Sequence, residues 1–119
     1  MSEHVHWMLE LALKDGAAED FKALMREMVE ATRADEPGAL IYEWYIDEAE
    51  TSVHISERYA DSAATMTHLN NFGTKFAARF MELARPTRMT VYGTPNEEAS
   101  AALKRLNATF LSEIGGFAR

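Results

Sequence analysis

Cysteine is absent from this 119-residue sequence, and long hydrophobic runs are absent as well. The first absence excludes disulfide bonds, catalytic thiols and cysteine metal ligands, and it suits a protein of the reducing cytoplasm. The second absence excludes a membrane-spanning helix. The N-terminal stretch, MSEHVHWMLELALKDG, is acidic and interrupted, which is not the pattern of a signal peptide. We therefore expect a cytoplasmic protein with no membrane partner.

Positive charge is also scarce. The sequence has 12 lysines and arginines against 19 aspartates and glutamates, so its formal net charge is −7. A field of this sign repels nucleic acid and anionic lipid, and no cluster of basic residues breaks the pattern. We therefore expect no nucleic-acid partner.

The composition is typical of a single globular domain. Hydrophobic residues make up 47% of the chain and charged residues 26%, and the length is that of one domain. There is no linker and no low-complexity run, and the glycine-rich nucleotide motifs and the GxSxG motif of hydrolases are absent. We expect one domain over residues 1–119.

Hydrophobic periodicity predicts the secondary structure. Val5, Trp7 and Leu9 alternate with other residues, which indicates a strand, whereas Phe21 and Met28 belong to an apolar stripe at helical spacing. The same patterns along the chain predict strands at His4–Leu13, Ala39–Asp47, Thr51–Tyr59 and Thr87–Gly93, and helices at about Ala17–Arg33, from Asp61 or Ser62 to Leu83, and from Asn96 to Leu106. We expect Gly73 to kink or split the second helix, and the tail from Ala108 to be extended.

The order of these elements is β-α-β-β-α-β, followed by a helix and a tail, which is the order of the ferredoxin-like fold. We therefore expect an α+β protein whose four-stranded antiparallel sheet carries two helices on one face. On the second strand, alternation places Ile41 and Tyr45 on one face and four residues on the other: Leu40, Tyr42, Trp44 and Ile46. Because both sheet faces are apolar, we expect two copies to pack sheet against sheet as a homodimer.

Several segments resemble a known family. LELALKDGAAEDFKALMREMVEATRADEPGALIYEWY and ISERYADSAATMTHLNNFGTKF are similar to the antibiotic biosynthesis monooxygenase superfamily, over roughly Val5 to Tyr92. The most specific parts are EPGALIYE at the entry to the hairpin, the pair Glu57-Arg58 before the second helix, and His68-Leu69 inside it. The resemblance implies a dimeric α+β barrel of ferredoxin-like protomers, with a pocket between sheet and helices in each protomer.

The resemblance also implies an activity. Characterised members of the superfamily oxidise polycyclic phenols or quinols with O2, without a metal, flavin or other cofactor. We therefore expect a cofactor-independent monooxygenase acting on a small aromatic, phenolic or quinol-like ligand. The alternative is a protein of the same fold that binds or isomerises a small molecule without oxygen chemistry. In the heme-degrading branch, the ligand histidine corresponds to Ala78 here and the first-strand asparagine to a position near Leu9. The heme-binding residues are therefore missing, and no cofactor is expected.

His68 and Glu57 are the candidate catalytic residues. His68 lies at the flank of the apolar stripe of the second helix, where a neutral imidazole could accept a proton from a phenol. The alternative is a partly buried histidine that bonds a neighbouring carbonyl. Glu57 shares its strand face with Val53, Ile55 and Tyr59, so its carboxylate needs a partner, and it could orient His68 or a substrate hydroxyl. The alternative is a salt bridge at a dimer or helix contact.

Five further residues are candidates for substrate binding: Trp7, Tyr42, Trp44, Asn71 and Phe72. Aromatic walls suit a flat phenolic ligand, although core and dimer packing would explain most of these side chains equally well. A metal site is not expected. His4 and His6 share a strand face, but no third ligand can be named for them or for His54.

Overall fold

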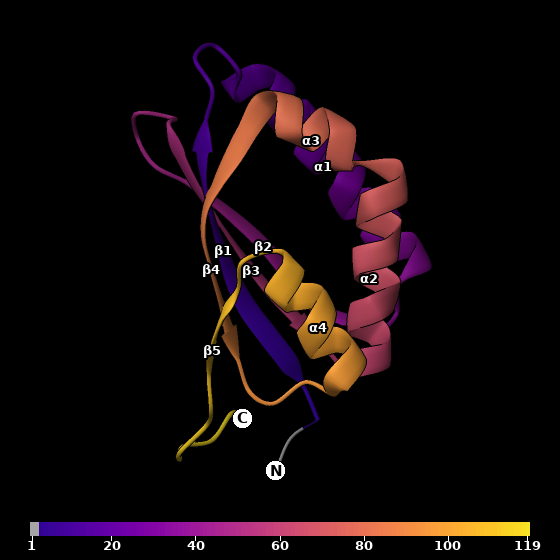
Figure 1. The fold of residues 1–119 in the computed structure, drawn as a ribbon. Helices are drawn as coiled ribbons and strands as arrows, with labels where there is room; N and C mark the ends of the chain where they lie inside the picture. Colours follow the sequence, from indigo (N-terminus) through magenta and orange to yellow (C-terminus); the bar gives the residue numbers. More distant parts are fainter. Residues whose placement is uncertain (1–2) are drawn as a thin grey trace.

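The computed structural model describes residues 3–119 as nine helices and strands in one unit (Figure 1). In chain order the elements are β1 (Val5–Leu13), α1 (Ala18–Asp35), β2 (Ala39–Ile46), β3 (Ser52–Tyr59), α2 (Ser62–Lys75), α3 (Ala77–Leu83), β4 (Ala84–Tyr92), α4 (Glu97–Arg105) and β5 (Thr109–Leu111). In this part of the chain no helix has both the length and the apolar character needed to cross a membrane.

The sheet confirms the ferredoxin-like arrangement. Its strand order is β2-β3-β1-β4-β5, and the first four strands pair antiparallel. The short β5, which falls within the tail expected to be extended, pairs parallel with β4 and makes the sheet mixed. All four helices lie on one side of the sheet (Figure 1), so strand residues that point to that side form the core.

Side-chain caps begin two of the helices. The Asp61 carboxylate accepts a hydrogen bond from the Ala64 backbone N–H at 2.8 Å, and the Asn96 side chain accepts one from Ala99 at 2.9 Å. Both caps lie where the sequence predicts them. At the N-cap, the side-chain oxygen accepts a hydrogen bond from a backbone N–H of the first turn that otherwise has no partner.

Loss of the Asp61 cap gives a measurable change in stability. We expect Asp61→Ala to lower the free energy of unfolding by about 1 kcal/mol, because Ala64 N–H loses its acceptor. Asp61→Asn should keep most of the stability, since asparagine caps equally well. Urea denaturation of the three proteins checks this, and an alanine variant as stable as wild type would show that the cap contributes nothing.

The predicted helix break is displaced from Gly73 to Phe76. Gly73 stays within α2, whereas Phe76 has φ −129° and ψ −22° and separates α2 from α3. Phe76 is only 8% exposed and belongs to the core cluster around Phe21 and Phe80. The helix therefore breaks where an aromatic side chain is anchored in the core, and not where glycine merely permits a break.

Two strands also differ from the sequence pattern. β4 begins at Ala84 and includes Pro86, which pairs with Leu11 beside a register shift in β1 where a missing N–H is tolerated. A second register shift lies between Ala39 and Ile41 of β2. Leu40 is therefore 48% exposed and does not share a face with Tyr42. Alternation alone predicts that the two residues share one.

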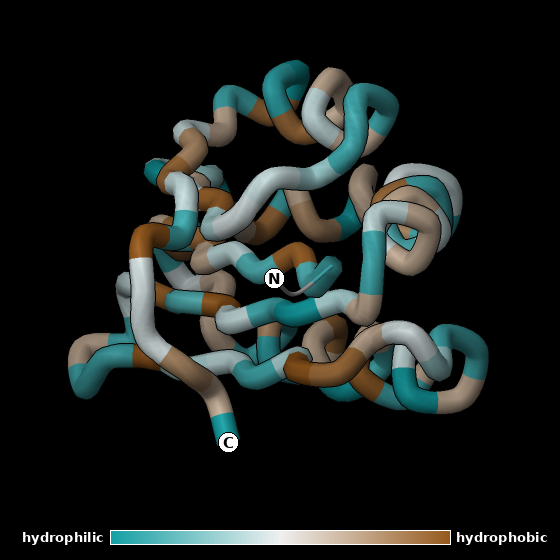
Figure 2. Tube along the Cα trace, turned by 90° about the horizontal axis from the view of Figure 1, so that it is seen from below, coloured by the Kyte–Doolittle hydropathy of each residue, from teal (hydrophilic) through white to brown (hydrophobic). Residues whose placement is uncertain are grey.

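The helix-facing side of the sheet packs two adjoining hydrophobic clusters. One is built around Leu11, Ile55 and Phe80, and the other around Trp7 and Tyr59. Viewed from below, hydrophobic and hydrophilic stretches alternate along the helices and strands, and the C-terminal end projects from the rest of the molecule (Figure 2). The two clusters hold β1 and β3 against α1, α3 and α4, and α2 packs against their edges. A cavity lies where these layers meet.

Candidate active site

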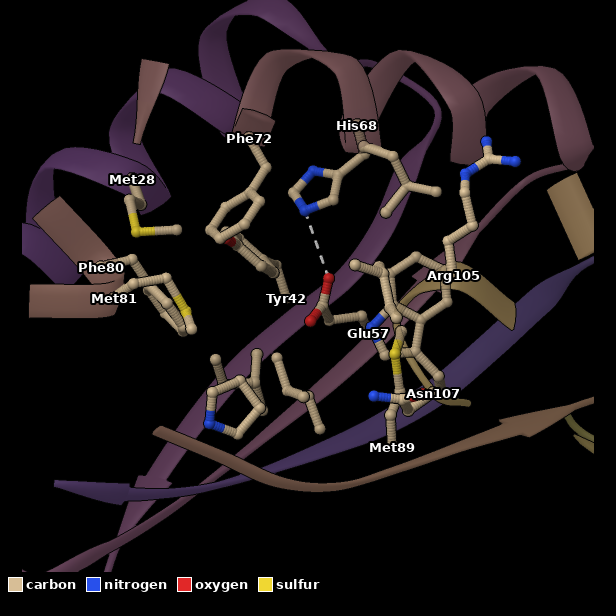
Figure 3. Close-up of a pocket in the computed structure, with 16 residues that line it drawn as sticks. Met28, Tyr42, Glu57, His68, Phe72, Phe80, Met81, Met89, Arg105 and Asn107 are labelled. Carbon is tan, nitrogen blue, oxygen red and sulfur yellow. Dashed lines mark ion pairs between the residues drawn. The ribbon is translucent and has the colours of Figure 1, made fainter. Parts of the chain in front are cut away.

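A cavity of about 370 Å³ lies between the sheet and the helices (Figure 3). Its lining is mainly apolar and comes from every helix and from four strands: Trp7, Leu9, Met28, Tyr42, Ile55, Glu57, His68, Leu69, Phe72, Phe80, Met81, Pro86, Met89, Arg105, Leu106 and Asn107. This volume is in the range of small-molecule sites, which are mostly apolar with a few placed polar groups. The resemblance implied a pocket in this position.

His68 and Glu57 meet at the inner end of this cavity. His68 projects from α2 and Glu57 from β3, where burial alternates and puts Glu57 on the helix side with Ile55 and Tyr59. His68 Nε2 lies 3.3 Å from Glu57 Oε1, and their side chains are only 7% and 4% exposed. Figure 3 shows this ion pair, with the second Glu57 oxygen pointing into the open part of the cavity. The buried carboxylate therefore has the partner that its surroundings require.

A second carboxylate, from Glu36, holds the other side of the His68 ring. Glu36 follows the last turn of α1, and its Oε1 lies 2.9 Å from His68 Nδ1 with the side chain 6% exposed. Its other oxygen accepts a hydrogen bond from Asn71 Nδ2 at 3.2 Å. Both ring nitrogens of His68 therefore face carboxylates, and Asn71 fixes one of those carboxylates.

The sequence patterns did not predict Glu36 as a site residue. By sequence, Glu36 belongs only to the turn that ends the first helix. A signal was present, however. Met28, Thr32 and Glu36 are spaced four residues apart, and the structure buries all three. Extending the apolar stripe from Met28 by two steps of four residues, through Thr32, would have placed the Glu36 carboxylate on the inward face.

The two carboxylates determine the protonation state of His68. Burial alone would lower the pKa of His68, but hydrogen bonds to Glu36 and Glu57, and the charges of both, raise the pKa to about 9. For Glu36, burial acts to raise the pKa, and the hydrogen bond and charge of His68 outweigh it and lower the pKa. His68 is thus an imidazolium at neutral pH. The raised pKa differs from the neutral imidazole that the sequence analysis expects to accept a proton.

Two tyrosines complete the polar end of the cavity. Tyr59 donates its hydroxyl to Glu57 Oε1 at 2.7 Å, and its ring lies 4.8 Å from the His68 ring. The Tyr42 ring packs edge-on against His68 with centroids 5.2 Å apart. Burial, followed by the charges of Glu57 and Glu36, raises the pKa of both Tyr42 and Tyr59. Both phenols are therefore neutral; Tyr42 lines the cavity, and Tyr59 lies behind the lining and donates to Glu57.

Three of the five expected substrate-binding residues line this cavity, namely Trp7, Tyr42 and Phe72, and two do not. Trp44 packs on Phe21, with ring centroids 5.6 Å apart, and borders a separate hollow of about 150 Å³. Asn71 is engaged with Glu36. The contact with Phe21 places the Trp44 ring against α1, which alternation along the strand cannot reveal.

The other histidines have no part in this cavity. His6 lies near Ser56 and Arg58 on the opposite sheet face, and His54 is 3.5 Å from Glu10. Over residues 3–119, no group of three or more histidine, cysteine, aspartate or glutamate side chains is arranged to hold a metal ion. His68 has both ring nitrogens occupied by carboxylates, so it is also not available to ligate heme iron.

The chemistry available at this site is proton transfer in apolar surroundings. The Glu57 carboxylate can accept a proton, the adjacent imidazolium can stabilise a negative charge that develops nearby, and Glu36 holds that imidazolium in place. Trp7 is the direct cross-strand neighbour of Glu57 and lines the same cavity, so an aromatic ring can lie against its face.

Comparison with known proteins agrees with this architecture. The model of the family Antibiotic biosynthesis monooxygenase matches residues 5–78, more than half of the chain. The chain belongs to the antibiotic biosynthesis monooxygenase family. The match spans β1 through α2 and includes Glu36, Glu57 and His68, so the whole polar cluster lies within the family domain.

Solved structures show the same fold. MupZ from Pseudomonas fluorescens is 26% identical with a TM-score of 0.88, covering all of this chain and 91% of that protein. Rv0793 from Mycobacterium tuberculosis is 25% identical with a TM-score of 0.63, covering 79% and 97%. SnoaB from Streptomyces nogalater, described as a cofactor-independent oxygenase, is 15% identical with a TM-score of 0.66, covering 80% and 96%. No curated protein matches the chain in sequence.

Proposed function

We propose that this member of the family is a cofactor-independent monooxygenase that oxidises a small phenolic or quinol substrate with O2. The observation that carries the proposal is the position of Glu57 and His68 at the inner end of a cavity with aromatic and apolar walls. SnoaB, which shares the fold, is described as a cofactor-independent oxygenase. The family and the fold make oxygen chemistry the first hypothesis, and the cavity supplies the proton transfer that such chemistry needs.

In this proposal Glu57, rather than His68, accepts the substrate proton. The O–H bond of the phenol breaks, its proton goes to the Glu57 carboxylate, and the imidazolium of His68 stabilises the electron-rich phenolate. The phenolate passes one electron to O2, and the resulting phenoxyl radical and superoxide combine at a ring carbon. Glu57 returns its proton to the peroxide anion, and loss of water from the resulting hydroperoxide gives a quinone and leaves Glu57 as a carboxylate again. Overall, one phenol and one O2 give one quinone and one water. O2 is therefore the only oxidant that the reaction requires.

A second function is favoured by the protonation state of His68. An imidazolium beside a carboxylate places a proton donor next to a proton acceptor. Such a pair can catalyse an isomerisation, a reaction that needs no oxygen. The runner-up is therefore a protein that binds or isomerises a small molecule in the same cavity. It shares all the site residues of the first proposal and differs only in the use of O2.

We also propose that the protein acts as a cytoplasmic homodimer. On the sheet face away from the helices, Tyr45 and Tyr92 are 56% and 39% exposed. On β3, Arg58 has a buried Nε without a hydrogen-bond partner in the described chain. A second copy packed on this face would cover the rings and supply an acceptor for Arg58. Light scattering at micromolar concentration tests this, and a monomer would rule it out.

The test of activity is O2 consumption by chelator-treated protein with a panel of quinols and polycyclic phenols, with the products identified by mass spectrometry after reaction under 18O2. We expect O2 uptake matched by a quinone that contains one 18O atom. A flavin, heme or metal present in stoichiometric amount in active protein would contradict the proposal. Conversion of a ligand without O2 uptake would establish the isomerase alternative instead.

A further inference from the structure

The polar cluster of Glu36, His68 and Glu57 carries an unbalanced charge. Two carboxylates flank one imidazolium, and all three side chains are at most 7% exposed. Glu57 Oε1 accepts hydrogen bonds from both Tyr59 and His68, as the oxygen of a carboxylate does. The cluster therefore has a net charge of −1 in a place that water screens poorly.

No cation within the described chain neutralises this charge at short range. The lysine that influences Glu36 most, Lys75, lies 3.9 Å from Asp35. Arg105 lines the cavity, but it is exposed, and Figure 3 shows its guanidinium turned away from Glu57 toward α2. The inner end of the cavity is therefore negative, and Arg105, the one arginine or lysine among the described lining residues, points away from it.

The protein's own phenols already show the consequence of this field. Tyr42 and Tyr59 adjoin the cluster, and burial together with the charges of Glu57 and Glu36 raises the pKa of each. An external phenol that enters beside Glu57 meets the same burial and the same charges. It is therefore held in its neutral form until its proton has an acceptor within the site.

We infer that the inner end of this cavity binds neutral hydroxyl-bearing aromatic ligands and rejects their anions, so that the substrate enters protonated and loses its proton only to Glu57. This deepens the proposed function by naming the substrate's charge state. When the O–H bond breaks and the proton moves to Glu57, the negative charge moves from the carboxylate to the substrate oxygen. The net charge of the site then stays at −1, whereas binding a preformed phenolate would add a second negative charge.

The probe for this inference is 4-nitrophenol, because it titrates close to neutral pH, where His68 remains protonated, and because its anion has a distinct visible absorption band. The experiment is done without O2 at neutral pH, with half of the probe ionised. We expect added protein to bleach the anion band as the neutral phenol binds. The neutral form should bind at least tenfold more tightly than the anion.

Two variants identify the source of the effect. Glu57→Gln removes the negative charge nearest the bound phenol, so it should reduce the preference for the neutral phenol several-fold. Glu36→Gln should reduce it less, because without the Glu36 charge the pKa of His68 falls and the lost imidazolium charge offsets the lost carboxylate charge. Glu43→Gln is the matched control. Glu43 accepts a hydrogen bond from Tyr45 two residues on, as Glu57 does from Tyr59, but it is exposed. It should leave the bleaching unchanged.

Several results would overturn the inference: growth of the anion band on binding, an unchanged band at saturating protein, or equal bleaching in all three variants. These outcomes can be told apart from a failure of the proposed function, because the binding experiment is done without O2 and does not measure oxidation. Bleaching that depends on Glu57, together with no O2 uptake from any quinol, would keep the charge selectivity and remove the monooxygenase activity.

Discussion

Glu57→Gln is expected to lower the rate of O2 uptake with a phenolic substrate by about 10² to 10⁴-fold, the usual contribution of a general base. Glutamine has nearly the same shape and can still accept hydrogen bonds from Tyr59 and His68, but its amide cannot take a proton from the substrate. The loss should therefore fall on kcat more than on substrate binding. Steady-state oxygen-electrode kinetics check this.

The control for this experiment is Glu43→Gln, which makes the same chemical change on the neighbouring strand at an exposed position. It should keep wild-type kinetics. Circular dichroism and thermal unfolding of both variants establish that they are folded. If Glu57→Gln is folded and retains activity within a few-fold of wild type, then Glu57 is not the proton acceptor, and the mechanism fails at its first step.

Glu36→Gln is expected to remove a large part of the pH-dependent stability of the protein. The folded-state pKa of His68 is about 9, against an ordinary value of 6.5. Because the folded-state pKa is raised, the associated stability is fully present below pH 6.5 and is lost as the pH rises through 9. The shift corresponds to about 3 kcal/mol. Without the Glu36 charge, the pKa of His68 should fall and most of this contribution should disappear.

The measurement is urea denaturation between pH 6 and pH 10 at one fixed protein concentration, where Glu36 itself stays ionised because its pKa is lowered. Wild type should lose stability across this range, and Glu36→Gln should be less stable at pH 6 and change less with pH. Glu82→Gln is the matched control, since Glu82 is exposed at the end of α3. NMR titration of the His68 ring tests the cause, and a wild-type pKa near 6.5 would contradict it.

The local elements of this fold follow closely from local sequence. Asp61 and Asn96 start helices because their side chains satisfy backbone N–H groups three residues on, an interaction that needs no tertiary partner. The placement of Glu57 beside Ile55 on the core face follows from strand alternation, and the structure has it there. These are features with short-range causes, so a single sequence suffices to predict them.

Other features depend on contacts between distant parts of the chain. Phe76 breaks the helix because its ring is held in a core built from α1, β3 and α3. Leu40 turns outward because β2 shifts register against β3. Trp44 leaves the cavity because it packs on Phe21. Neither propensity nor periodicity encodes these long-range partners, which explains why the sequence-based expectations differ at these places.

The sequence by itself determined the class of the protein: an acidic, cysteine-free α+β chain of ferredoxin-like order, with His68 and Glu57 as candidate catalytic residues. Only the tertiary structure decided what those residues can do. Glu36 and His68 are 32 residues apart in the chain, and the fold brings them within 2.9 Å in a buried place. Protonation depends on burial and on neighbouring charges, which are properties of three-dimensional position. The fold places His68 between two carboxylates, which raise its pKa, and for this reason we propose Glu57 as the proton acceptor.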